Sequence, residues 1–194
     1  MLMNRIMGAY MFRKEVYAEV EKDESFTSTA WMLVAVFSFL NQIGSQAGVL
    51  ASSGVVGWIF AVIISTVFAV LGFALSAFVI SWVGKTFFKA DVNFGEVVRV
   101  LGLASVWQIV GFVGILSIIS AGLVCILSPL LIVAGILSLA AWLIAVKEAL
   151  DLDWVQTIIT VIIGFILNMI FLAIAGAILG ILGFGAAAAL GGLQ

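Results

Sequence analysis

The sequence predicts an all-α membrane protein: a polytopic helical bundle of five transmembrane helices preceded by an amphipathic helix. Hydrophobic residues make up 65% of the chain and charged residues only 9%, whereas about a quarter of the residues in a soluble domain are charged. The charges fall in three clusters, at residues 5–24, 85–99 and 147–153. Because a helix needs about 20 apolar residues to cross a bilayer, the first two uncharged runs each hold two crossings and the last holds one.

The first element, residues 1–27, is predicted to be an amphipathic helix in the cytoplasmic interface. At helical spacing its apolar face carries Met3, Ile6, Met7, Tyr10 and Tyr17, and its polar face carries Glu15, Glu19 and Lys22. The segment has no apolar core followed by a cleavage site, so it is not a signal peptide. Packing of this helix against the protein's own loops is the alternative interpretation.

The membrane domain is predicted to cover residues 28–183, followed by an apolar, non-cytoplasmic tail at 184–194. The small and polar stretches Gly48–Gly57 and Ser120–Pro129 predict the turns inside the two longer runs. Pro129 is expected near the start of a span, where its missing N–H is harmless, with a kink inside the span as the alternative. The five predicted spans are 28–49, 57–83, 96–119, 127–147 and 154–183.

Two span starts carry a capping pattern, in which a side-chain oxygen accepts an amide of the first helical turn and the residue three positions later reaches back. The patterns are Asn93-Phe-Gly-Glu96 and Asp153-Trp-Val-Gln156. Both stand where a charged loop enters an apolar run. Five spans place all eight Lys and Arg residues on one side, so the positive-inside rule predicts a cytoplasmic amino terminus and a non-cytoplasmic carboxyl terminus.

The composition argues against catalysis and against bound cofactors. The chain has no histidine and a single cysteine, Cys125, and no acid or base lies deep in a predicted span, so metal sites, nucleophile–histidine pairs and proton relays are disfavoured. Gly84-Lys85-Thr86 resembles the end of a phosphate-binding loop, but Val79 stands where that loop needs its first glycine. The net charge of −2 predicts no nucleic-acid partner.

A layer of polar side chains is predicted near the middle of the membrane. Interhelical hydrogen bonding is the favoured interpretation, because unpaired amides in lipid are costly. The alternative is a pocket for a hydrophobic small molecule, such as a quinone, a pigment or a lipid. Gly44-x-x-x-Gly48 and Gly176-x-x-x-Gly180 likewise indicate close helix packing. The layer consists of Asn41, Gln42, Gln108, Ser138 and Asn168.

The charged stretch between the second and third spans is a candidate docking face. Its phenylalanines are interleaved with charges, which offers apolar anchors with a charged rim. The alternative is a simple connection whose lysines only fix orientation. The docking candidates are Phe87, Phe88, Lys89, Asp91, Phe94 and Arg99.

Three stretches resemble the Yip-domain integral membrane proteins, whose name comes from eukaryotic members that interact with Ypt/Rab GTPases. They are "YMFRKEVYAEVEKDESFTSTAW", "NFGEVVRVLGLA" and "WLIAVKEALDLDWVQTIITVIIG". The resemblance rests on Phe94, Glu96, Arg99, Gly102 and Ala104, and on Trp142 followed by Lys147-Glu148-Ala149. It implies five spans with a cytosolic amino terminus.

The chain also departs from the family pattern. It has Lys14, and Ser105-Val106-Trp107, where similar sequences often carry prolines. The long cytosolic amino-terminal region of the eukaryotic members is missing, so the resemblance points to a prokaryotic-type member, and Rab binding is not carried over.

The resemblance and the composition together predict a non-enzymatic scaffold or adaptor in a prokaryotic inner or plasma membrane. Its expected partners are membrane lipids and other integral membrane proteins. The alternative is an accessory subunit of a larger bioenergetic or photosynthetic complex, packing beside pigments, quinones or lipids. A transporter is the weakest alternative, because no ionisable residue or pair of broken helices marks a path through the membrane.

Overall fold

The predicted fold class is confirmed. The computed structural model describes residues 2–181, and in this range the chain is entirely helical, with five helical stretches long and apolar enough to cross a membrane. A 3₁₀ helix, η1, continues directly from α5 within the third stretch. The elements are α1 (Leu2–Tyr10), α2 (Lys14–Lys22), α3 (Phe26–Ser45), α4 (Ala47–Phe88), α5 (Phe94–Ala104), η1 (Ser105–Ile118), α6 (Ala121–Leu150) and α7 (Trp154–Ile181).

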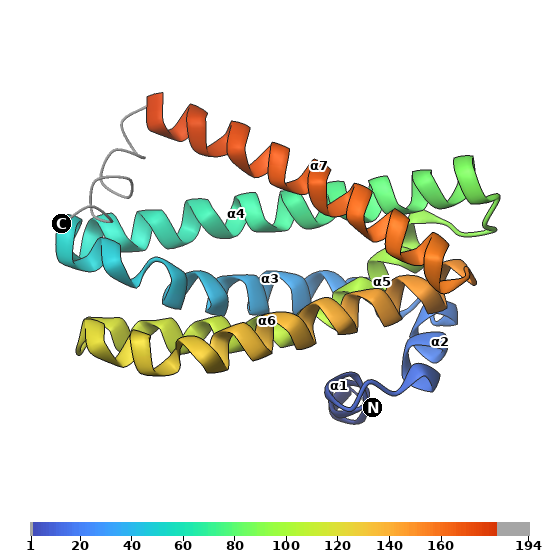
Figure 1. The fold of residues 1–194 in the computed structure, drawn as a ribbon, viewed down its shortest axis with the longest axis horizontal. Coiled ribbons are helices and arrows are strands. Elements are labelled where there is room, and N and C mark those ends of the chain that lie inside the picture. Colours follow the sequence, from blue (N-terminus) through green and yellow to red (C-terminus); the bar gives the residue numbers. More distant parts are fainter. Residues whose placement is uncertain (1, 182–194) are drawn as a thin grey trace.

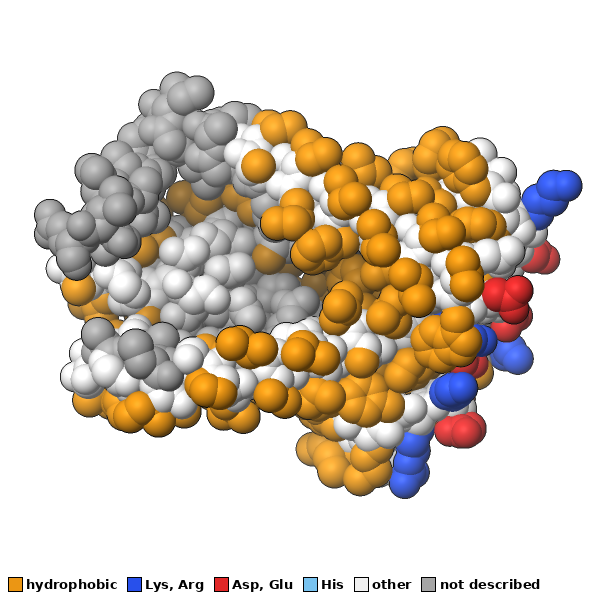
Figure 2. All heavy atoms as spheres, in the orientation of Figure 1, with side chains coloured by type: hydrophobic (Ala, Val, Ile, Leu, Met, Phe, Trp, Pro, Cys, Tyr) orange, Lys and Arg blue, Asp and Glu red, His pale blue; other side chains and the backbone are white. Residues whose placement is uncertain are grey.

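The long helices run along a common direction, with α1 and α2 beside one end of the bundle (Figure 1). We call this the charged end, because the Lys, Arg, Asp and Glu side chains gather there (Figure 2). The buried core also lies in this half, where α5 supplies an unbroken buried run from Val97 to Ala104. Toward the opposite end, α7 diverges from α6.

The amino-terminal segment forms two short helices where the sequence suggested one. The chain breaks between them, and Phe12 adopts a positive φ of 54°. The two helices differ in how far they are buried in the protein. Tyr17 and Val20 of α2 are fully buried, in a helix that packs on α5 and α6, whereas Met3 and Met7 of α1 are 69% and 48% exposed.

Only Gln46 separates α3 from α4, and the start of α4 continues in the direction of α3 before the chain reverses (Figure 1). The beginning of α4 is a short helical piece that ends at Gly54, whose φ of 68° interrupts the helix. An L side chain rarely adopts such a value, so glycine allows the break without strain. The first reversal inside an apolar run therefore lies within the predicted turn at Gly48–Gly57, and the Gln46 side-chain amide donates to the Ser65 hydroxyl across it at 2.9 Å.

The third and fourth spans each begin with a side-chain cap. At the start of α5 the Asn93–Glu96 capping box forms as the sequence predicts. At the next reversal, Ser120 caps α6 by accepting a hydrogen bond from the Gly122 amide. This cap starts the helix at Ala121, so Pro129 lies inside α6 and not in its first turn. The expectation that Pro129 lies in the first turn of a helix is therefore wrong, although the residue does stand near the start of the span Ile126–Leu150.

Close helix contact through glycine occurs at one of the two predicted glycine pairs. A Cβ on Gly44 would lie 2.0 Å from the Gly111 carbonyl oxygen of η1, whereas Gly48 has no atom within 4 Å of that position. The surroundings of Gly176 and Gly180, and the predicted tail at 184–194, lie outside what the structure describes.

Candidate functional site

The charged end is held together by Arg99, which the sequence placed on an exposed docking face. Its side chain is only 5% exposed. Nε donates to the Glu21 carbonyl oxygen at 2.8 Å, Nη2 donates to the same oxygen, and Nη1 lies 3.4 Å from the Thr27 hydroxyl. Arg99 therefore joins α5 to the end of α2 and the start of α3. The proposal of Arg99 as a docking residue is corrected, because its donors are used inside the protein.

A second cation, Arg5, ties α1 to α2. Its guanidinium group lies 2.6 Å from Glu19 and 2.8 Å from Asp23, and it covers the ring of Phe26 at 5.1 Å. The hydrogen bonds that Arg5 donates to Glu19 raise the pKa of Arg5. The pKa of Asp23 is lowered, first by a hydrogen bond from the Ser25 hydroxyl and then by Arg5. These contacts fix the polar face of α1 against α2.

Acidic side chains from three separate elements also converge at the charged end. Burial raises the pKa of Glu21, and repulsion from Asp151 and Glu96 raises it further. Among the described residues there is no group of three acidic, cysteine or histidine side chains that could hold a metal ion.

The segment from the end of α4 to the start of α5 is the most exposed part of the predicted docking face. Phe87 is 64% exposed and packs edge-to-face on the exposed Trp82, with ring centroids 5.9 Å apart. Lys89 and Asp91 are exposed, and Phe94 is 39% exposed. Phe88 differs, because it packs against the buried core. We call Phe87, Lys89, Asp91 and Phe94 the docking surface.

The amino-terminal segment is also anchored to the third span through aromatic side chains whose partners the sequence did not identify. The Tyr10 hydroxyl donates to the Val106 carbonyl oxygen at 2.8 Å. Its ring meets Trp107 edge-on at 5.1 Å, and Phe12 stacks on the same indole at 5.4 Å. The apolar face read from the helical period included Tyr10, but its partner 96 residues away in sequence could not be inferred from that pattern.

The predicted polar layer separates into two groups that bond different helices. On one side, Asn41 donates to the Gln108 backbone carbonyl at 3.0 Å, and Ser38 donates to the Gln108 side-chain oxygen at 3.2 Å. On the other side, Asn168 donates to the Gly72 carbonyl at 3.2 Å and to the Ser76 hydroxyl at 2.7 Å. The first group joins α3 to η1, and the second joins α7 to α4. Such bonds are worth about 0.6 to 2 kcal/mol each in a membrane.

Gln42, the remaining amide of the α3 pair, takes no part in these bonds. Within the described residues its side chain makes no hydrogen bond and does not line the cavity described next. Because Gln42 stands one position after Asn41 in the helix, its side chain lies on a different face of α3 from the Asn41 side chain.

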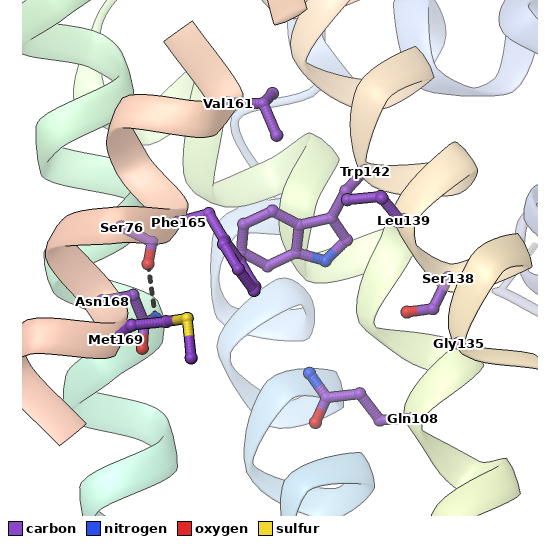
Figure 3. Close-up of a pocket in the computed structure, with 10 residues that line it drawn as sticks. All are labelled: Ser76, Gln108, Gly135, Ser138, Leu139, Trp142, Val161, Phe165, Asn168 and Met169. Atoms are coloured by element: carbon purple, nitrogen blue, oxygen red, sulfur yellow. Dashed lines mark hydrogen bonds between the residues drawn. The ribbon is translucent and has the colours of Figure 1, made fainter. Parts of the chain in front are cut away.

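A cavity with a volume of about 390 Å³ lies between the two bonded groups. Gln108, Ser138 and Asn168 of the predicted layer line it, whereas Asn41 and Gln42 do not. The structure adds Ser76, Trp142 and Phe165 to its wall (Figure 3). The sequence missed these three because a serine or an aromatic residue in an apolar span gives no signal of which cavity it faces.

Comparison with known proteins assigns the chain by family only. The family model of the Yip1 domain matches residues 8–176. No curated protein and no solved structure matches the chain significantly. The match begins within α1 and ends within α7, so it takes in both the charged end and the cavity.

Proposed function

The chain belongs to the Yip1-domain family, and from this membership and its one-sided charge we propose that it is a non-enzymatic membrane scaffold or adaptor. It would organise other integral membrane proteins through its charged end. The observation that carries the proposal is the docking surface, where exposed phenylalanines stand beside Lys89 and Asp91. Apolar anchors with a charged rim are typical of protein interfaces.

The position of the docking surface supports a protein partner over simple lipid contact. Phe87 and Phe94 flank a loop that carries a cation and an anion, and charged groups at the rim of a patch favour contact with a complementary protein. By contrast, on the face shown in Figure 2 the charged side chains lie at the charged end, and apolar side chains cover the middle of the helices. Those side chains are expected to contact lipid.

A photo-crosslinking phenylalanine analogue introduced in place of Phe87 is expected to form a discrete adduct with another membrane protein in cells. The matched control carries the analogue in place of Phe78, which is 57% exposed on the same helix but lies farther from the charged loop. This control should crosslink to lipid only. Lipid adducts alone at both positions would leave the charged loop as a connection between two spans, and the scaffold proposal would fail.

We also propose that the charged end faces the cytoplasm. Four of the eight Lys and Arg residues lie in the amino-terminal segment, and the other four lie close to the loops at the charged end. Positive residues are retained on the cytoplasmic side of a membrane. Location in a prokaryotic inner or plasma membrane remains a prediction of the sequence.

Truncated fusions to alkaline phosphatase, which is active only after export, test this orientation. The fusion after Ala90, at the charged end, is expected to be inactive, and the fusion after Ser120, at the opposite end, is expected to be active. Equal expression of the two fusions on an immunoblot is the control. The reversed pattern of activity would place the charged end outside the cytoplasm.

An accessory subunit of a larger membrane complex is the second candidate function. The exposed apolar side chains of α6 and α7, such as Ile136 and Ile162, favour it, because they could pack against another membrane component. Purification in mild detergent separates the two functions. A stoichiometric large complex is expected of a subunit, and a monomer or dimer with substoichiometric partners is expected of an adaptor.

A further inference from the structure

The cavity is a cleft near the middle of the membrane, between the diverging helices α6 and α7. Its surface is hollowed between these helices in the space-filling view (Figure 2), and Ser76 of α4 and Gln108 of η1 line its inner wall. Ser76 and Ser138 each lie twelve residues from the charged-end terminus of their helix, which corresponds to about 18 Å at 1.5 Å per residue. The hydrocarbon core is about 30 Å thick, so the cleft lies deep in the apolar layer.

Hydrogen-bonding groups on one side of the cleft have no partner in the protein. The side-chain oxygen of Gln108 accepts from Ser38, but within the described residues its amide nitrogen, the Ser138 hydroxyl and the Trp142 indole N–H make no hydrogen bond. In Figure 3 the Gln108 amide nitrogen and the Trp142 indole both point into the space between α6 and α7. The Asn168 amide nitrogen on the other side is already bonded to Ser76 and Gly72.

Unpaired donors at this depth are costly, because lipid tails offer them no acceptor. Interhelical bonding explains Asn41 and Asn168, whose amides do bridge helices, but it does not explain the free donors of Gln108, Ser138 and Trp142. An acceptor supplied from outside the chain would satisfy them. The cavity volume of about 390 Å³ falls in the range of about 300–1,000 Å³ that is usual for ligand sites.

We propose that this cleft binds a flat, lipid-soluble ring that carries carbonyl oxygens, which is the chemistry of a quinone. The carbonyl oxygens accept from the Gln108 amide, the Ser138 hydroxyl and the Trp142 indole, and the ring lies between the aromatic side chains of Trp142 and Phe165. The depth favours this class over a phospholipid, since the ester carbonyls of a phospholipid stay near the headgroups. The site does not depend on the proposed scaffold function.

The test is titration of the purified, delipidated full-length protein with decylubiquinone in detergent, read as the shift of its thermal unfolding midpoint. Saturable binding is expected. Trp142→Phe and Ser138→Ala should each weaken it about fivefold, the effect of losing one hydrogen bond. Gln108→Leu should do at least the same, but it also removes the acceptor of Ser38, so Ser138→Ala, which breaks no bond among the described residues, is the cleaner variant.

The matched control is Gln42→Leu, the same substitution on α3 outside the cleft, which should leave the affinity unchanged. Decylbenzene, which has the tail and a ring but no carbonyl oxygen, should bind more weakly than decylubiquinone. Mass spectrometry of the organic extract from protein purified in mild detergent should detect a quinone near stoichiometry. Retention of phospholipid alone, or equal binding by wild type, Ser138→Ala and Gln42→Leu, would overturn the proposal.

Discussion

Among the glycines that the structure describes, Gly44 is the one at which replacement by Ala is expected to give the largest loss of stability. The new Cβ would lie 2.0 Å from the Gly111 carbonyl oxygen and 2.9 Å from the Phe112 carbonyl oxygen. Both contacts are with backbone, which cannot rotate away as a side chain can. The helices α3 and η1 must therefore separate, and we expect a cost of about 3 kcal/mol, at the upper end of the usual range for overpacking.

Unfolding by titration with a denaturing detergent, starting from mild micelles, measures this cost. Gly48→Ala is the matched control, because it stands one turn away in the same motif with nothing within 4 Å of its Cβ position. It should be neutral or slightly stabilising, since alanine has the better helix propensity. Equal stability of the two variants would show that α3 and η1 do not approach each other at Gly44.

Arg99→Met is expected to loosen the charged end by about 2 to 3 kcal/mol, the usual contribution of hydrogen bonds to a charged group. Methionine keeps an unbranched apolar stem but leaves the Glu21 carbonyl oxygen without the two donors that it now accepts from. The loss should concentrate in α2, which is held to α5 through this contact. Faster proteolysis between α2 and α3 should therefore accompany the lower free energy of unfolding.

Lys89→Met serves as the control for Arg99, because it removes a cation from an exposed position of the same end. It should change the free energy of unfolding by less than about 0.5 kcal/mol. Arg99→Lys should lie between the two, since an ammonium group retains the charge but not the planar fork that places two donors on one oxygen. If Arg99→Met and Lys89→Met behave alike, the buried clamp does not stabilise the charged end.

The number of spans and the position of the charged loops could be predicted from the sequence, because these depend on local composition. A charge cannot stand in the middle of an apolar layer without a large cost, so the clusters around Lys85 and Lys147 mark the ends of helices. The Asn93–Glu96 capping box could also be read directly, since both partners lie within one turn. The sequence alone therefore determined the fold class and the end of the bundle at which the charged side chains lie.

Properties that depend on a partner far along the chain required the tertiary structure. Arg99 belongs to a charged cluster in the sequence, yet it is buried and donates hydrogen bonds to the Glu21 carbonyl oxygen, 78 residues earlier in the chain. Asn41, Gln108 and Asn168 stand at similar depths, yet only the orientation of each helix decides which helix each of them bonds and which of them also line the cleft. Helical period fixes the face of a residue on its own helix, but the packing of the neighbouring helices decides what that face meets.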